Sequence, residues 1–173
     1  MTQFFRAKFE YFRNNLKQRD EELYYEAFNY LEEIFQTNGL QKVKELAKIY
    51  QSNIEEISPF IENATQIVCP SCQEVCCINK HGYYNFEDLI YFHAIELKPP
   101  VYKSVGNDSE PCQFLTPEGC SLKRSLRPSG CNWYFCDPLL EYIENLPEYN
   151  KFDDKIKYLA EIWIMMIEEF SNL

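Results

Sequence analysis

The eight cysteines of this chain lie in one stretch of the sequence, and this clustering limits how that stretch can fold. All of them fall between residues 69 and 136 of the 173-residue chain, and neither flank contains one. Cysteine at this density is typical of a scaffold that depends on its sulfur atoms. Residues 101–119 also lack helical periodicity and are rich in turn formers. Apolar packing alone gives such a segment little to fold around, so we expect the cysteines to organise it.

The spacing of the cysteines favours metal ligation. Two residues separate Cys69 from Cys72 and four separate Cys131 from Cys136, and loops of this length let two sulfurs bind one metal ion at about 2.3 Å. Thiolates that lie close together repel one another, and a cation offsets that repulsion. Zinc binding would stabilise the turn-rich segment by up to about 10–16 kcal/mol per structural ion. The candidate ligands are Cys69, Cys72, Cys76, Cys77, Cys112, Cys120, Cys131 and Cys136.

Three other interpretations of the cysteines are weaker. Burial as small apolar side chains is common for one or two cysteines but not for eight in a cluster. Four disulfides fit the even number, but the chain starts without an apolar signal segment, so we expect a cytoplasmic location where thiols stay reduced. A thioredoxin-like redox pair at Cys69 and Cys72 would require a surrounding strand–helix–strand pattern, which the sequence lacks.

The adjacent pair Cys76 and Cys77 bears on the number of metal sites. The side chains of neighbouring residues diverge in most backbone conformations, so binding of both to one ion would be strained. Each of them serves a different metal ion, or one binds while the other packs. Eight sulfurs allow two four-sulfur sites or one polynuclear cluster, and the sequence leaves both open.

The two histidines are not included among the candidate ligands. His81 follows Cys77 after three residues, a spacing that a zinc site could use, but a histidine in an Asn-Lys-His-Gly turn is more often solvated. His93 lies on the apolar side of a predicted helix, where a hydrogen-bonded core histidine is the usual finding.

Both flanks have helical periodicity. Residues 1–66 contain three runs of apolar residues at helical spacing, of which the second begins after Asp20 and ends at Asn38-Gly39. Ser52 with Glu55, and Ser58 before Pro59, are further helix-start signals in this flank.

Two more helices are predicted beyond the N-terminal flank. Residues 138–173 predict a helix that opens at Asp153 or Asp154, with Met165 and Met166 as core filling. In the cysteine-rich centre, only Phe86–Leu97 has a clear helical pattern, with Asn85 as its N-cap.

These patterns predict a mainly α fold that forms a single domain over residues 1–173. The helical N-terminal flank (1–66) and the C-terminal helix region (138–173) would pack around an irregular, metal-stapled cysteine-rich centre (67–137) with little or no sheet. The formal net charge of −10 repels phosphate, so we expect neither nucleic acid nor an anionic membrane surface as a partner. A protein partner could bind through the acidic helical flanks, and the oligomeric state is open.

The centre resembles the YkgJ-type cysteine-cluster proteins, which are described as carrying a zinc- or iron-chelating domain. The resemblance covers about residues 67–137. Its motifs are Cys69-x2-Cys72-x3-Cys76-Cys77, Phe86-Glu87-Asp88-Leu89, Cys112-Gln-Phe114-Leu115, Gly119-Cys120 and Arg127-Pro128-x2-Cys131, with an aromatic-rich stretch up to Cys136. The sequence departs from the family at Asn132, where arginine is usual, and at Lys123, where an aromatic residue is usual.

The resemblance implies metal binding through the cysteines, by zinc or by an iron–sulfur centre. A similar pattern occurs in flagellin lysine methylases. The resemblance also favours a role for Arg127 beside metal-bound thiolates, where its guanidinium would orient the ligands.

Together these features predict a cytoplasmic protein whose cysteines bind zinc in one or two sites, in a structural, storage or sensing role. The alternative is an iron–sulfur protein, with a 4Fe–4S cluster or iron, that has redox or methyltransferase-type activity. No catalytic motif accompanies the cysteines: the sequence has no Gly-rich phosphate loop, no Gly-x-Ser-x-Gly and no His-Glu-x-x-His. Whether the protein is an enzyme is therefore left open by its sequence.

Overall fold

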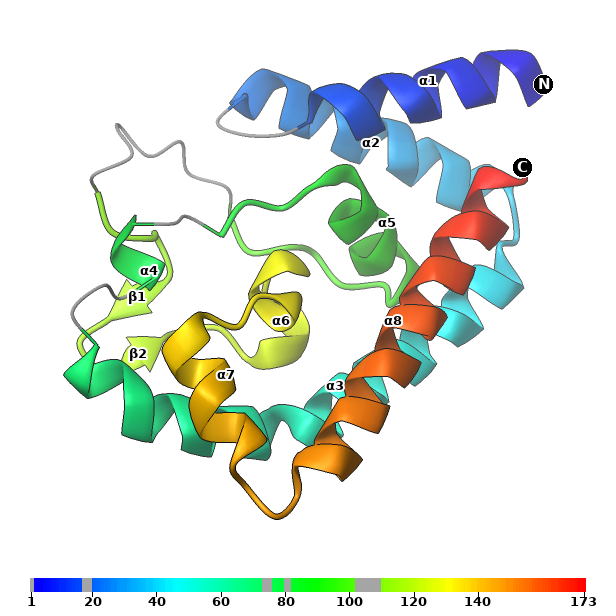
Figure 1. The fold of residues 1–173 in the computed structure, drawn as a ribbon. Helices are drawn as coiled ribbons and strands as arrows, with labels where there is room; N and C mark the ends of the chain where they lie inside the picture. The colour runs from blue at the N-terminus through cyan, green and yellow to red at the C-terminus, as the bar shows by residue number, and fades with distance from the viewer. Residues whose placement is uncertain (1, 17–19, 73–75, 80–81, 102–109) are drawn as a thin grey trace. The chain divides into compact units, whose positions relative to one another are not determined.

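The computed structural model describes residues 2–16, 20–72, 76–79, 82–101 and 110–173, and it is mainly helical (Figure 1). Its elements are α1 (Thr2–Asn15), α2 (Glu21–Thr37), α3 (Gln41–Val68), η1 (Cys69–Ser71), α4 (Cys76–Asn79), α5 (Phe86–Ala94), β1 (Leu115–Thr116), β2 (Gly119–Cys120), η2 (Arg124–Leu126), α6 (Gly130–Trp133), α7 (Asp137–Glu144) and α8 (Tyr149–Ser171). The two short strands form the single sheet of these ranges, so the prediction of a mainly α fold is confirmed. None of the helices in the described ranges combines the length and apolar character that a membrane crossing requires.

The chain forms two compact units, each assembled from segments that are distant in the sequence. The first unit comprises Met1–Tyr50, Tyr83–Ser104 and Glu161–Leu173, and the second comprises Gln51–Gly82 and Val105–Ala160. The long helices α3 and α8 contribute residues to both units. All eight cysteines belong to the second unit, whereas α5 belongs to the first. The single-domain organisation stays a prediction.

The core of the first unit is built from aromatic side chains. The ring of Phe12, which is fully buried, lies 5.4 Å from that of Phe86 on α5 and 5.3 Å from that of Tyr30 on α2. Phe170 of α8 packs against the same group, with its ring 5.6 Å from that of Phe5. Burial raises the pKa of Tyr30 to about 12. The C-terminal helix therefore packs on the N-terminal helices within this unit, as its apolar face predicts.

Helix α5 starts as the sequence predicts and ends earlier. The Asn85 side chain accepts a hydrogen bond from the amide of Asp88, and the Asp88 carboxylate accepts one from the amide of Asn85, so that the two residues form a capping box. The helix ends at Ala94, and Glu96 adopts a positive φ of 58°. The prediction that this helix extends to Leu97 is wrong, because the chain has already turned at Glu96, and Leu97 is exposed.

The sequence predicts two helix starts that do not occur, at Ser52 with Glu55 and at Ser58-Pro59, because both lie inside α3. Residues Gln41–Val68 form one continuous helix with Pro59 inside it. Its apolar face continues through the proline, because Ile54, Ile57 and Ile61 are all buried. Burial of this continuous face outweighs the hydrogen bond that proline removes, a cost of about 3 kcal/mol. The Ser58 hydroxyl donates to Glu62 instead of capping a new helix.

Helix α8 likewise begins earlier than its predicted start at Asp153 or Asp154. It begins at Tyr149, so Phe152 lies in its first turn, where it is buried and its ring lies 4.6 Å from that of Phe60. Of the two methionines, Met166 is fully buried and fills the core as predicted. Met165 is exposed, so the prediction of a core role is wrong for that residue.

His93 is a core histidine, as its position predicts. Its Nδ1 lies 2.8 Å from the carbonyl oxygen of Leu89, which accepts a hydrogen bond from the ring. Its Nε2 is buried and has no hydrogen-bond partner among the described residues. The ring packs against Phe28 and Phe35, with centroid distances of 4.5 and 5.6 Å. Protonation would place a second N–H in this apolar environment, and burial accordingly lowers the pKa of His93 from its ordinary 6.5.

We therefore expect the stability of the protein to decrease as the pH falls below about 6.5. The unfolded chain binds the proton at the ordinary pKa of histidine, whereas the folded chain resists it. The contribution of His93 to the free energy of unfolding is therefore complete above pH 6.5. It decreases as the pH falls from 6.5 to the lowered pKa, by at most about 1.4 kcal/mol per pH unit. Chemical denaturation between pH 5 and 8 measures this loss. The variant His93→Asn, which keeps a donor near Nδ1 but does not titrate, should lose the dependence; an unchanged slope would contradict the assignment.

Candidate metal centre

The second unit places its cysteines at the ends of short elements and in the turns between them. Cys69 begins η1 and Cys72 follows it, while Cys76 and Cys77 are the first residues of α4. Cys112 precedes the hairpin, Cys120 ends β2, Cys131 lies in α6, and Cys136 is the N-cap residue of α7. All eight lie within the described ranges, and all are reduced thiols rather than disulfides.

The exposure of the cysteines does not fit a role as core residues. Cysteine is among the residue types that are most often fully buried. None of these eight, all of which the structure describes, is in the buried class, and Cys77 and Cys131 are exposed. Packing therefore does not account for their presence.

One neighbourhood of thiols forms around Cys69. The amide of Cys72 donates to the carbonyl oxygen of Cys69 at 3.2 Å, and this turn keeps the two residues close together. Burial raises the pKa of the Cys69 thiol, and the charges of Cys136, Cys76 and Cys72 raise it further. We call these four residues the Cys69 set. It joins the end of α3 to the start of α7, 60 or more residues later in the chain.

A second neighbourhood forms around Cys77. The amide of Cys112 donates to the carbonyl oxygen of Cys77 at 2.7 Å, which ties α4 to the segment before the hairpin. The Cys112 carbonyl in turn accepts from the amide of Leu115 at 2.9 Å, and Leu115 pairs with Cys120 across the two strands. These backbone contacts thus connect Cys77 to Cys112, and Cys112 through Leu115 to Cys120.

The electrostatics of Cys77 show the same grouping. Burial raises the pKa of the Cys77 thiol, and the charges of Cys112 and Cys120 add to this effect, followed by the smaller effect of Cys69. The Arg127 guanidinium opposes them. The charge of Cys69 also raises the pKa of Cys77, so the two neighbourhoods adjoin.

Cys131 lies next to Gly82 and shares an electrostatic neighbour, Arg124, with Cys120. A Cβ atom built on Gly82 would lie 3.1 Å from the Cys131 sulfur and 3.3 Å from a ring carbon of Pro128. Cys131 and Cys120 both act electrostatically on one buried side chain, Arg124. We therefore group Cys131 with Cys77, Cys112 and Cys120 and call these four the Cys77 set.

We expect Gly82→Ala to destabilise the second unit by about 1 kcal/mol, because the added methyl group would lie only 3.1 Å from the Cys131 sulfur and 3.3 Å from Pro128, and these neighbours would have to shift. Urea denaturation measures the loss. Gly130→Ala is the matched control, since a Cβ there meets nothing within 4 Å. Equal stability of the two variants would contradict the close approach of Gly82 to Cys131.

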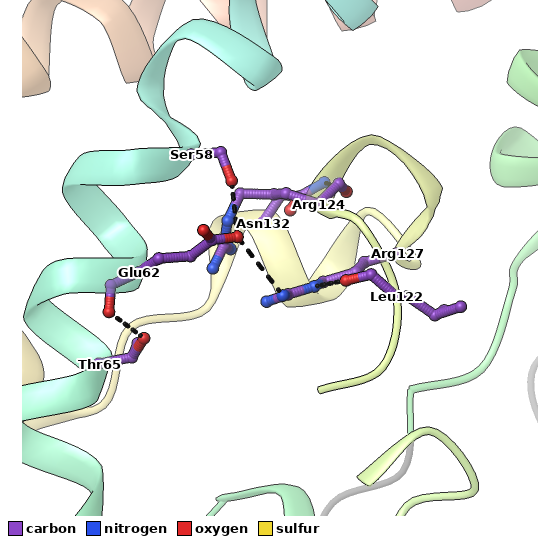
Figure 2. A network of polar contacts seen from close by, with 7 residues as sticks. All are labelled: Ser58, Glu62, Thr65, Leu122, Arg124, Arg127 and Asn132. Carbon is purple, nitrogen blue, oxygen red and sulfur yellow. Dashed lines mark hydrogen bonds and ion pairs between the residues drawn. The ribbon is translucent and has the colours of Figure 1, made fainter. Parts of the chain in front are cut away.

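Arg127 is held by one hydrogen bond and one ion pair (Figure 2). Its Nε donates to the carbonyl oxygen of Leu122 at 3.0 Å, and one terminal nitrogen lies 3.8 Å from Glu62 on α3. The Ser58 hydroxyl donates to the same Glu62 oxygen at 2.9 Å. Burial raises the pKa of Cys77 more than the charge of this guanidinium lowers it, and the role of Arg127 beside metal-bound thiolates stays a prediction.

A second arginine, Arg124 in η2, belongs to the same environment, and the sequence analysis missed it. Only 4% of Arg124 is exposed, and its Nε has no hydrogen-bond partner among the described residues. Burial, and next the charge of Arg127, lower the pKa of Arg124 to about 10, against the opposite effects of Glu62, Cys131 and Cys120. The sequence signal is weak, because Lys123-Arg124 looks like an ordinary pair of surface cations.

The described residues contain no group of three or more histidine, cysteine, aspartate or glutamate side chains in the geometry that holds a metal ion. The structure brings the cysteines into two neighbourhoods but not into a closed coordination shell. His81 lies outside the described residues, so its role as a ligand is not tested. The chemistry of the donors nevertheless fits a soft or borderline cation, because eight reduced, accessible thiols share one unit with two guanidinium groups.

Comparison with known proteins adds no relative to this description. No family model, no curated protein and no solved structure matches the chain.

Proposed function

We propose that this protein binds metal ions through its cysteine thiolates, with zinc as the preferred ion. One observation carries the proposal: eight reduced thiols, none of them buried, occur as electrostatic neighbours in a single unit of the fold. Burial and the neighbouring thiols raise the pKa of Cys69 and of Cys77, so these two thiols favour the neutral, protonated form when no cation is present. A bound divalent ion reverses this preference, because it stabilises the thiolate form.

The four-plus-four grouping supports two separate sites. The Cys69 set and the Cys77 set each supply four sulfurs, which is the number that a structural zinc ion takes. The adjacent residues Cys76 and Cys77 fall into different sets, which relieves the strain of binding one ion with neighbouring side chains. Each set also joins segments that are distant in the sequence, so each ion would act as a cross-link within the second unit.

The proposed role is structural. A zinc ion held by four protein thiolates has no open position for a substrate, whereas catalytic zinc keeps one. The segments that carry the ligands are the shortest elements of the chain and contribute few fully buried side chains. Metal cross-links would supply the stability that packing does not. The resemblance to the YkgJ-type proteins rests on the sequence pattern alone and agrees with cysteine ligation.

Purification of the full chain under anaerobic conditions, followed by metal analysis and a visible absorption spectrum, tests this proposal. We expect a colourless protein that contains two zinc ions per chain. A brown protein with iron and acid-labile sulfide would replace zinc with the iron–sulfur alternative, since tetrahedral sulfur sites suit both. A protein that contains no metal and does not take up added zinc would overturn the proposal.

A further inference from the structure

We infer that a groove between α3 and α7 binds a basic amphipathic helix of a partner protein. The inference does not depend on metal binding, and it gives a definite place to the protein partner that the acidic flanks predict. It rests on the apolar lining of the groove, on its exposure to solvent and on the charge beside it.

The groove lies within the second unit and has a volume of about 540 Å³. One wall comes from the end of α3 and from η1, and the other comes from α7 and the turn after it. The apolar lining residues are Ile67, Val68, Pro138, Tyr142 and Leu146. None of them is buried, and Ile67 is 58% exposed. The groove is therefore an apolar surface that the fold leaves open.

Helix α7 has apolar residues on two sides, and the core uses only one of them. Leu139 and Ile143, which are four residues apart, are buried. Pro138 and Tyr142, which are also four residues apart, line the groove instead. Ile67 of α3 lines the same groove, so two helices present apolar side chains to one space. A partner helix fits such a space, with apolar anchors at positions i, i+3, i+4 and i+7.

The groove does not suit a small molecule. Pockets for small molecules enclose about 70–90% of the ligand surface. This groove is open to solvent, and more than half of the Ile67 side chain that lines it is exposed. A ligand confined to the groove would therefore leave much of its surface in water, whereas a helix that extends beyond the groove would cover Ile67.

The charge beside the groove determines the chemistry of the partner. Glu141 lines the groove, and Asp137 and Glu144 lie four and three residues from it on the same side of α7. All three are exposed, and none forms an ion pair within the described ranges. The sequence has no lysine or arginine in residues 49–79 or 128–150, from which both walls come. Lysine or arginine side chains beside the apolar anchors of the partner would therefore complement these carboxylates.

A second copy of this chain is a poorer occupant than a basic helix. Two copies that met through the groove would form an isologous contact, in which the same carboxylates face each other. Repulsion between these like charges disfavours such a dimer, and the net charge of −10 acts in the same direction.

Binding of a synthetic helical peptide to the full chain, as purified, tests the inference. The peptide carries leucine at i, i+3, i+4 and i+7 and lysine at the flanking positions. Fluorescence anisotropy measures its affinity at physiological salt, where the attraction between net charges is screened. A peptide of the same composition in scrambled order is the control for net charge. We expect the ordered peptide to bind at least about 10-fold more tightly, because only the ordered peptide presents an apolar face.

Two substitutions locate the peptide on the groove, and each has a matched control. Ile67→Ser removes an apolar contact and should weaken binding about 10-fold, whereas Ile164→Ser, at a side chain 54% exposed on α8, should leave the affinity unchanged. Glu141→Lys reverses a charge in the groove and should also weaken binding about 10-fold. Glu118→Lys, between the two strands, changes the net charge equally and should have little effect. All four side chains are exposed, so urea denaturation should show that the variants stay folded.

Three results would overturn the inference. The first is equal affinity for the ordered and the scrambled peptide. The second is an equal loss of affinity in a groove variant and its matched control, or no loss in either. The third is self-association of the chain that Ile67→Ser abolishes, because it would assign the groove to a second copy. None of these results depends on the zinc content, so the proposed function is tested separately.

Discussion

Replacement of Cys72 by serine should release the zinc ion of the Cys69 set and unfold the segments that this set joins, while the Cys77 set keeps its ion and the helices of the first unit persist. Serine cannot replace a thiolate as a soft ligand, so the Cys69 set would retain three sulfurs and lose most of its affinity. The variant would lose a large stabilisation, since binding of a structural zinc ion contributes up to about 10–16 kcal/mol. Hydrogen exchange should show the loss in η1, α4 and α7, with protection retained in α2 and α5.

The matched control for this variant is Ser71→Ala. Ser71 precedes Cys72 and donates a single exposed hydrogen bond to the Val68 carbonyl oxygen. Its replacement should leave metal content and exchange unchanged. Loss of protection in α5 to the same extent as in α7 would show that both units unfold together. Full retention of metal by Cys72→Ser would remove this residue from the ligands.

The second large effect concerns pairs of cysteines, because the two sets predict which double variants are equivalent. Cys76→Ser with Cys136→Ser damages only the Cys69 set, so one zinc ion per chain should survive dialysis against a chelator. Cys76→Ser with Cys77→Ser damages both sets, so none should survive. Metal analysis of the dialysed proteins measures the difference.

Each double variant replaces two cysteines by serine, so each serves as the control for the other. A single polynuclear cluster that shares all eight sulfurs would make them behave alike, and this result would contradict two separate sites. Unchanged zinc content in the single variant Cys77→Ser would show instead that Cys77 packs rather than binds.

The sequence predicts the helices where local chemistry determines them. Asp20 caps α2, with its carboxylate accepting from the Leu23 amide at 2.9 Å, and Asn85 caps α5 in the same way. Both helices follow from a side chain that satisfies nearby backbone donors, and such interactions span only three residues. The prediction goes wrong at Pro59, where burial of distant side chains outweighs the local preference for a break.

Three helices of the second unit, α4, α6 and α7, could not be predicted from the sequence, for two different reasons. In α4 and α6, four residues give too short a period to recognise. In α7, Asp137 and Pro138 follow Cys136 as an ordinary helix start with proline near the N-terminus, but the helix has only two fully buried apolar residues, Leu139 and Ile143. Periodicity over eight residues is a weak signal.

The candidate ligands could be predicted from the sequence, but their grouping could not. Spacing alone pairs Cys131 with Cys136, because only four residues separate them. In the structure, the charge of Cys136 raises the pKa of Cys69, while the Cys131 sulfur lies against Gly82. The turn that separates the two cysteines and the chain reversals that bring residues 69 and 136 together are long-range features, and no local pattern encodes them. The burial of Arg124 is hidden from the sequence for the same reason.

X-ray absorption spectroscopy at the zinc edge tests cysteine ligation most directly, because it counts and identifies the atoms bound to the metal. The full chain, purified with its native metal under anaerobic conditions, should give a shell of four sulfur atoms at about 2.3 Å and no nitrogen or oxygen neighbours. A shell of nitrogen and oxygen atoms, or a protein that carries no metal at the edge measured and binds none when zinc is added, would contradict the proposal that these thiolates hold the ion.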